Sequence, residues 1–162
     1  MRIYVREMAT LEHRIKVEKN VYVYVNDINP NGKKAILLIH GWPANYKMFE
    51  YQYNYLIENG CRCIGVDMRG FGQSDKPVYG YNYDRLADDI RAVIDFLHLR
   101  DLTLAGHSTG GAIAIRYVAR HKSRGVSKLA LFAAAAPSLI QRPGFPYGQT
   151  REAIEAIIAA TY

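Results

Sequence analysis

The sequence has little cysteine and no long apolar run. Its two cysteines, Cys61 and Cys63, are separated by one residue at the start of an apolar segment. That spacing makes them poor disulfide partners, and two thiols are too few for a zinc site. No run approaches the length of a transmembrane helix, and residues 1–7 carry charges where a signal peptide would have an apolar core. We therefore expect a protein of the reducing cytoplasm that holds no metal and does not enter a membrane.

A concentrated patch of one charge is also missing. The 21 lysines and arginines outnumber the 15 acidic residues and give a formal net charge of +6. These basic residues are scattered singly or in pairs such as Lys33-Lys34, whereas nucleic-acid-binding proteins gather them in a stripe. We therefore expect no nucleic-acid partner. The 162 residues, 49% of them hydrophobic, correspond to one domain or to part of one.

What is present is a pentapeptide of the form G-x-S-x-G, from Gly106 to Gly110. It follows the short apolar run Leu102–Ala105 and precedes Gly111–Ala119, a segment of small residues that can form a helix. Strand, sharp turn and helix are the context of a nucleophile elbow, whose turn is so tight that only very small residues fit on either side of the serine. The pattern predicts Ser108 as a nucleophile at the N-terminus of a helix. The alternative is an ordinary glycine turn that contains a serine.

A second motif supports the elbow. The buried strand Ala35–Ile39 ends in His40-Gly41-Trp42-Pro43. In acyl-transfer enzymes of this architecture, the loop after such a strand supplies one N–H to the oxyanion hole, and the residue after the nucleophile supplies the other. We therefore predict the backbone N–H groups of Trp42 and Thr109 as the two donors, since Pro43 has none.

Two histidines near these motifs are interpreted as structural. His40 stands at a strand end, where a hydrogen-bonded histidine would fix the loop that follows. His107 is adjacent to Ser108, so its side chain leaves the backbone in a different direction from the serine hydroxyl.

Together these motifs resemble the α/β-hydrolase superfamily. The markers are His40–Pro43, then Gly65–Asp75, then Gly106–Gly111, in the order and spacing of the N-terminal half of that fold. The pair HGWP and GHSTGG is most similar to the cofactor-free haloperoxidase, perhydrolase and arylesterase group. The resemblance covers about residues 10 to 140. It implies an acyl-transfer enzyme without metal or organic cofactor.

The middle marker contains a glycine-punctuated loop from Arg69 to Asp75. We expect Arg69 and Asp75 to hold this loop in place through charge-assisted hydrogen bonds. A phosphate-binding loop is the alternative, but neither G-K-[ST] nor G-x-G-x-x-G follows.

A catalytic base is not evident. In the superfamily the chain order is serine, then an acid, then histidine, and the only histidine after Ser108 is His121. It lies at the end of the helix that follows the elbow, about 18 Å from the nucleophile for a helix of about a dozen residues. His13 and His98 lie upstream, outside the family's order. We therefore assign neither acid nor base, and expect the N-terminal part of a longer hydrolase: a truncated gene product, an expressed piece, or a chain that a partner completes.

The expected fold is α/β, a mostly parallel sheet with an antiparallel start, truncated after about six strands and followed by the beginning of a helical cap. The expected helices are Tyr46–Asn59, Tyr83–Leu99, one after the elbow, and Gln149–Tyr162. The expected strands are Glu12–Glu18, Val21–Asn26, Ala35–Ile39, Arg62–Val66, Leu102–Ala105 and Lys128–Ala133.

This arrangement divides the chain into two parts and leaves the last strand unpaired at one edge of the sheet. Residues 1–136 would form the core and residues 137–162 the connector and first cap helix, with Pro137 ending the sixth strand's run. The apolar face Ile154, Ile157 and Ile158 would either pack or line an acyl pocket, and packing is the default. The last strand would be an edge with the uncharged stretch Leu129–Ala136, through which chains could self-associate.

The predicted function is a serine hydrolase that acts on small-molecule carboxylic esters through an acyl-enzyme on Ser108. Lactonase and carbon–carbon bond hydrolase activities would use the same machinery. Epoxide hydrolases and haloalkane dehalogenases of this fold carry aspartate at the elbow, so Ser108 argues against them. The alternative from another class is a non-catalytic fragment of the hydrolase fold.

Overall fold

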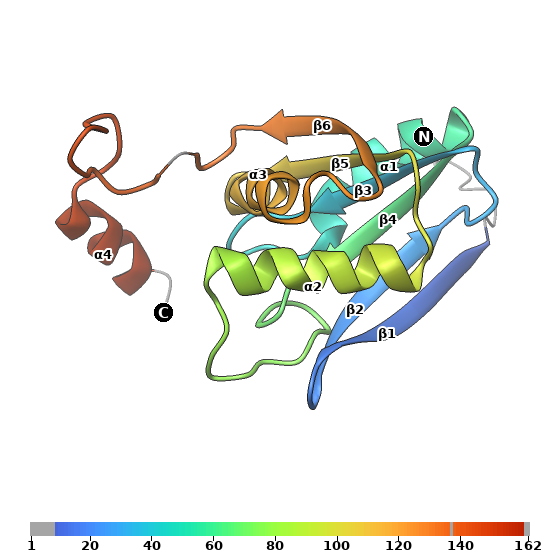
Figure 1. Ribbon diagram of the computed structural model, residues 1–162, viewed down its shortest axis with the longest axis horizontal. Coiled ribbons are helices and arrows are strands. Elements are labelled where there is room, and N and C mark those ends of the chain that lie inside the picture. The colour runs from blue at the N-terminus through green and yellow to red at the C-terminus, as the bar shows by residue number, and fades with distance from the viewer. Residues whose placement is uncertain (1–8, 137, 161–162) are drawn as a thin grey trace.

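Six strands form one sheet (Figure 1): β1 (Thr10–Glu18), β2 (Val21–Ile28), β3 (Lys34–Ile39), β4 (Cys61–Asp67), β5 (Leu102–His107) and β6 (Val126–Phe132). The structure, a computed structural model, describes residues 9–136 and 138–160. The strand order is β1-β2-β4-β3-β5-β6. β1 pairs with β2, and β2 with β4, in antiparallel fashion, while the other neighbours are parallel. This confirms the expected mostly parallel sheet with an antiparallel start.

The strands differ from the predicted ones by one or two residues at their ends, and for β5 and β6 the reason is local. β5 continues past Ala105 because Gly106 and His107 still pair with Leu131 and Phe132 of β6. β6 stops before Ala133, which adopts a positive φ of 44°, a conformation that no strand residue can hold. The elbow serine therefore follows directly on a strand that is paired to its last residue.

Helices cover both faces of the sheet (Figure 1). α2 (Tyr83–Phe96) and α3 (Thr109–His121) lie on one face, and α1 (Glu50–Glu58) lies on the other, after a short 3₁₀ turn at Tyr46–Phe49. The expected helix 83–99 ends early, since His98 has a φ of 51°. The alternation of strands and helices that the sequence predicts is confirmed.

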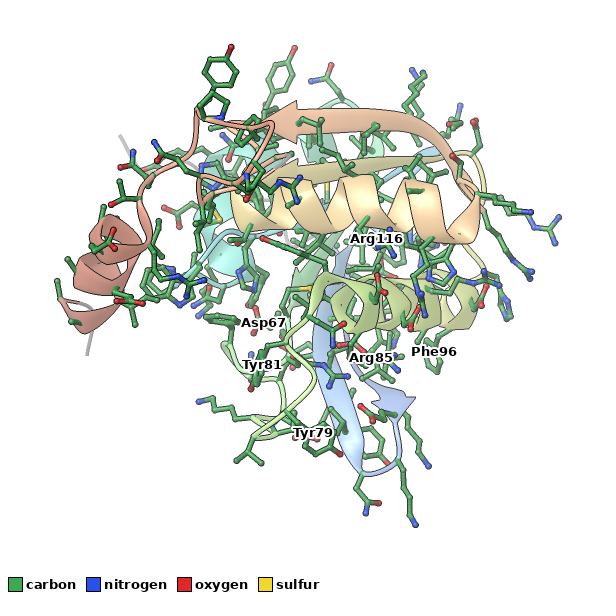
Figure 2. All side chains as sticks on the ribbon, turned by 60° about the vertical axis from the view of Figure 1, so that its left-hand side comes forward. Asp67, Tyr79, Tyr81, Arg85, Phe96 and Arg116 are labelled. Carbon is green, nitrogen blue, oxygen red and sulfur yellow. The ribbon has the colours of Figure 1, made fainter. Side chains whose placement is uncertain are left out.

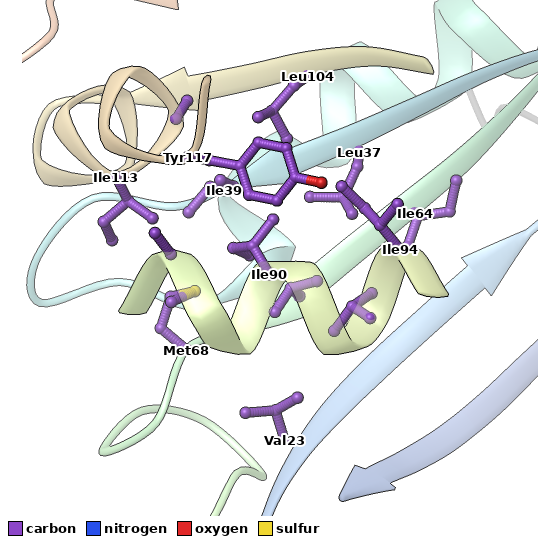
Figure 3. Packing of buried hydrophobic residues seen from close by; sticks show 14 of the residues in the cluster. Val23, Leu37, Ile39, Ile64, Met68, Ile90, Ile94, Leu104, Ile113 and Tyr117 are labelled. Carbon is purple, nitrogen blue, oxygen red and sulfur yellow. The ribbon is translucent and has the colours of Figure 1, made fainter. Parts of the chain in front are cut away.

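The larger core lies between the sheet and the pair α2 and α3 (Figure 3). Leu37 and Ile39 of β3 face this core, whereas Leu38 between them faces α1 with Phe49 and Tyr53. β3 is therefore buried on both faces, which explains its unbroken apolar sequence. A rigid central strand places the loop that follows it, from His40 onward.

Charged residues tie α2 to α3 on the outer surface. Arg116, labelled in Figure 2, donates a hydrogen bond to Asp84, and Arg120 donates to both oxygens of Asp88 at 2.7 and 3.0 Å. His121 Nε2 lies 2.9 Å from Asp88 Oδ1, at the C-terminal end of α3. The prediction that His121 sits at the end of the helix away from Ser108 is confirmed.

β6 forms one edge of the sheet, as predicted. Its side chains are largely exposed, with Leu129, Leu131 and Phe132 at 40, 43 and 47% of their maximal exposure. Self-association through this edge stays a prediction, which light scattering of the purified chain at rising concentration would measure.

The last described segment stands apart from the core (Figure 1). It ends in α4 (Arg151–Ala159), which the Thr150 hydroxyl caps and in which no residue is fully buried. Pro137 and Tyr162, which the sequence analysis used, lie outside the described residues, and the division of the chain at residues 136 and 137 stays a prediction. Within residues 9–136 and 138–160, no helix is long and apolar enough to cross a membrane.

Candidate active site

Ser108 occupies the turn between β5 and α3 in a strained backbone conformation. Its φ of 52° and ψ of −118° lie in a region that residues with a side chain rarely adopt, at a cost of about 1–3 kcal/mol. Its N–H donates to Phe132 O at 3.0 Å, and its carbonyl accepts from Ala135 N at 2.9 Å and from Gly111 N at 3.0 Å. These hydrogen bonds hold the Ser108 backbone in its strained conformation. The Ser108 side chain does not cap α3, which leaves its hydroxyl uncommitted to the helix.

The glycines around the serine are required by close backbone contacts. A Cβ on Gly106 would lie 2.3 Å from Gly110 O, and a Cβ on Gly110 would lie 2.2 Å from Ile39 O. The prediction that only very small residues fit at these two positions is confirmed, and the contacts are so close that even a Cβ is excluded. Gly111 is a third such position, because a Cβ there would lie 2.5 Å from the Ala134 Cβ. The doubled glycine is its only signal in the sequence.

The predicted oxyanion residues come together at the elbow. β3 and β5 are parallel neighbours, with Ile39 opposite Gly106, so the loops after both strands emerge at the same edge of the sheet. The Trp42 N–H donates to Thr109 Oγ1 at 3.0 Å. The structure thus brings Trp42, Ser108 and Thr109 together, and it places the Trp42 donor against the first residue of α3.

His40 holds the loop after β3. Its Nδ1 lies 2.8 Å from Gly41 O, and its Nε2 accepts the Met68 N–H at 3.0 Å. The side chain is almost fully buried and lies edge-on to Phe71. Burial lowers the pKa of His40, against the opposing effects of the Gly41 carbonyl and of Asp67. The structure fits the structural role predicted for His40, with the proton on Nδ1.

The neutral His40 should make the protein less stable in mild acid. Since burial lowers its pKa in the folded state, the unfolded chain takes up a proton below about pH 6.5 that the folded chain does not. The free energy of unfolding should therefore fall as the pH drops below about 6.5, by at most about 1.4 kcal/mol per pH unit. Urea unfolding between pH 5 and 8 measures this slope.

A variant pair isolates the contribution of His40. His40→Gln should be less stable than the parent but should lose this dependence on pH, whereas His98→Gln, at an exposed position, should keep it. Equal slopes in the parent and in His40→Gln would contradict the assignment of a neutral buried His40.

His107 is half-buried beside the nucleophile. Its Nδ1 is buried and has no hydrogen-bond partner among the described residues. A Cβ on Gly41 would lie 2.9 Å from this nitrogen, so His107 packs against the loop after β3. No hydrogen bond joins the Ser108 hydroxyl to a histidine or a carboxylate within residues 9–136 and 138–160.

The loop after β4 is held by internal polar contacts. Asp67 accepts the Tyr46 N–H and the Gln73 N–H, each at 2.8 Å. Asp75 accepts from Arg14 at 2.6 Å and from the Tyr22 N–H at 2.8 Å. The prediction that Asp75 helps to hold this loop is confirmed. The carboxylates of the loop bind groups of the fold itself, which is not the arrangement of a phosphate-binding loop. Sequence reasoning missed the contacts of Asp67, whose position before a glycine-rich loop is the only signal.

A cavity of about 410 Å³ opens beside the elbow. Its lining includes Trp42 and Thr109 but not Ser108 itself, so the cavity begins next to the nucleophile. Tyr81 lies on the loop before α2 (Figure 2) and contributes to the wall. The remaining lining is almost entirely aromatic and aliphatic: Met68, Phe71, Tyr83, Leu86, Ile113, Leu139, Ile154, Ile157 and Ile158.

The position of α4 corrects one expectation. The sequence favours packing for Ile154, Ile157 and Ile158, but these three side chains line the cavity and none is fully buried. The physical reason is that α4 stands at the rim of the cavity, where its apolar face meets the apolar wall of the cavity instead of a closed core.

Comparisons with known proteins agree with this fold. A family model described as alpha/beta hydrolase fold matches residues 34–160. The AB hydrolase superfamily protein YisY of Bacillus subtilis (strain 168) is 53% identical over 146 residues, which are 90% of this chain and 54% of that protein. A non-heme haloperoxidase of Rhodococcus erythropolis is 39% identical over 71% of this chain and 42% of its own length.

Solved structures give the same result. An esterase from Exiguobacterium antarcticum superposes with a TM-score of 0.87 at 47% identity, over 93% of this chain and 56% of the esterase. A bromoperoxidase from Bacillus anthracis superposes with a TM-score of 0.83 at 33% identity, over 90% of this chain and 53% of its own. The chain spans about half the length of the relatives that it matches.

Proposed function

Because this chain belongs to the alpha/beta hydrolase family, we propose that it carries the nucleophile and the oxyanion hole of a serine hydrolase for carboxylic esters. The observation that carries the proposal is the elbow, in which a strained Ser108 meets Trp42 and Thr109 at the N-terminus of α3. A glycine turn without function would not need this strain, which costs about 1–3 kcal/mol. The esterase and haloperoxidase relatives support the same class.

The mechanism proceeds through an acyl-enzyme. Ser108 Oγ forms a bond to the ester carbonyl carbon and gives its proton to a base, while the carbonyl oxygen becomes an oxyanion. The N–H groups of Trp42 and Thr109, with the positive end of the α3 dipole, stabilise this charge. The carbon–oxygen bond to the alcohol then breaks, and the alcohol leaves with the proton.

Water completes the reaction. It adds to the acyl carbon as the base takes its proton, and the second tetrahedral intermediate expels Ser108, which is reprotonated as the carboxylic acid leaves. Hydrogen peroxide in place of water would give a peracid by the same steps. We propose that the histidine and the acid that orients it come from outside these 162 residues, because His40 is held by Gly41 and Met68 and His121 lies beside Asp88.

The cavity favours an ester with an apolar acyl group. Aromatic and aliphatic side chains form almost all of its wall, and such a surface gains about 25 cal/mol for each Å² of apolar substrate that it covers. The contribution of α4 to this wall supports residues 137–162 as the start of a cap over a core of residues 1–136. The free, buried thiols of Cys61 and Cys63 support a reducing, cytoplasmic setting.

Labelling with a fluorophosphonate probe tests the proposal. In the longer protein that contains this sequence, we expect rapid stoichiometric labelling at Ser108, detected by intact mass and peptide mapping. The 162-residue chain alone, shown to be folded, should stay unlabelled on the same timescale because its serine lacks a base. Labelling at another residue of the longer protein would contradict the proposed nucleophile, and rapid labelling of the chain alone would place a base within it.

A further inference from the structure

The Thr109 hydroxyl is placed inside the proposed oxyanion hole. Thr109 is the first residue of α3, is half-buried, and lines the cavity. Its Oγ1 accepts the Trp42 N–H at 3.0 Å. The two groups that meet here come from loops after different strands, β3 and β5, so the contact joins the two halves of the hole.

This contact marks the position of the oxyanion. A backbone N–H points in one direction, so any oxygen that accepts from Trp42 in the transition state must lie close to the position of Thr109 Oγ1. The distance of 3.0 Å falls within the range expected between an oxyanion and its donors, about 2.7–3.1 Å. In the resting protein, a neutral hydroxyl oxygen therefore accepts the bond that the substrate oxygen will need.

The same hydroxyl has a proton to donate. A threonine hydroxyl has one O–H donor in addition to its acceptor lone pairs, and the bond from Trp42 uses only a lone pair. When the substrate oxygen acquires negative charge, it is the stronger acceptor for the Trp42 N–H, because bonds to ionised acceptors are about twice as strong as neutral ones. The freed Thr109 side chain can then turn about its Cα–Cβ bond, which moves Oγ1 out of this position and lets its O–H donate to the anion.

We propose that the Thr109 hydroxyl is a third donor of the oxyanion hole: it accepts the Trp42 N–H at rest and donates to the oxyanion in the transition state. The inference rests on the proposed function, with Ser108 as nucleophile. Thr109 makes and breaks no covalent bond; its side chain turns about the Cα–Cβ bond, so that Oγ1 gives way to the oxyanion and its O–H points toward it.

Substitution of Thr109 in the complete protein tests the inference. Thr109→Val preserves the shape of the side chain and removes only the hydroxyl. It should lower kcat for an ester substrate by about tenfold to a hundredfold, the loss expected for one hydrogen bond to a charged group, with little change in KM. Thr109→Ser restores the hydroxyl and should recover most of the loss. The matched control Thr103→Val makes the same change at a half-buried position near the start of β5 and should leave kcat unchanged.

A transition-state analogue separates a catalytic from a structural role. A trifluoromethyl ketone adds to the serine and forms a hemiketal oxyanion, so its affinity should fall in Thr109→Val by the same factor as kcat. The affinity for the corresponding alcohol, which forms no oxyanion, should not change. Full kcat in Thr109→Val, or equal defects in the Val and Ser variants, would overturn the inference.

Activity measurements on Ser108→Ala and Thr109→Val together distinguish a failure of this inference from a failure of the proposed function. If Ser108→Ala is inactive while Thr109→Val keeps full activity, only the role of the Thr109 hydroxyl is wrong. If Ser108→Ala retains activity, the nucleophile itself is wrong and the effect of Thr109 has another origin.

Discussion

Replacing Ser108 with alanine in the complete protein is expected to lower kcat for ester hydrolysis by about 10⁴- to 10⁶-fold. The substitution removes the only atom that can form the acyl-enzyme, whereas the oxyanion donors at Trp42 and Thr109 stay in place. Activity should therefore fall to the small rate enhancement that binding and the oxyanion hole supply alone. Initial rates with an ester of an apolar acyl group measure the loss.

The thermal stability of Ser108→Ala must also be measured, to show that the loss of activity is not a loss of folding. Alanine keeps the Cβ of serine, so the positive φ of 52° is neither relieved nor worsened, and the thermal midpoint should move by only a few degrees. Ser127→Ala, at an exposed position near the start of β6, is a control that should keep full activity. An active Ser108→Ala protein would remove Ser108 from the mechanism.

The elbow could be predicted because its physical requirements are local. Gly106 is forced by a backbone contact that the turn itself creates, whereas the contact that forces Gly110 is with Ile39 at the end of β3. The G-x-S-x-G pattern, the apolar strand before it and the helix after it are nevertheless visible in a short stretch of sequence. The same holds for β3, whose unbroken apolar run reflects burial on two faces. Such features need no knowledge of the rest of the chain.

The features that could not be predicted depend on contacts between distant segments. The Trp42 N–H meets the Thr109 side chain only because β3 and β5 are parallel neighbours, which neither motif reveals alone. The apolar face of α4 is expected to pack when the sequence is considered alone, and it lines the cavity because of where the connector carries the helix. Sequence therefore indicates which residues form the site but not how their side chains are arranged in it.

The ion-pair partner of Arg69 is another feature that the sequence alone could not predict. The sequence predicts that Arg69 holds its loop, but not that its guanidinium is fully buried and bound to Asp89 of α2 at 2.6 and 2.7 Å. Glu18 lies 3.2 Å from the same guanidinium. Gly80 is required nearby, since a Cβ there would lie 2.2 Å from Arg69 Nη1. Phe71 and Tyr81, both in the cavity wall, lie near opposite ends of the segment between β4 and α2, and these two ends thus meet at one buried charge.

Asp89→Asn should lower the free energy of unfolding by about 3 kcal/mol. The substitution keeps the shape of the side chain but leaves the Arg69 charge buried without its main counter-charge, and breaking a buried ion pair from one side costs about 3–5 kcal/mol. Glu18 and the introduced side-chain amide would compensate in part, which places the expected value at the low end. The shift of the urea midpoint at constant m-value measures the change.

The control lies on the same helix. Asp95 pairs with Arg91 at 2.5 Å, but its side chain is 47% exposed, so Asp95→Asn should cost less than about 1 kcal/mol. A loss as small for Asp89→Asn would mean that Arg69 is already balanced by Glu18. The double substitution Arg69→Met with Asp89→Leu removes both charges, and it should recover much of the stability that Asp89→Asn loses, because a buried pair replaced by apolar groups avoids the unpaired charge. If the double variant is instead the least stable of the set, the contribution of Arg69 lies in its hydrogen bonds to the fold rather than in its charge balance.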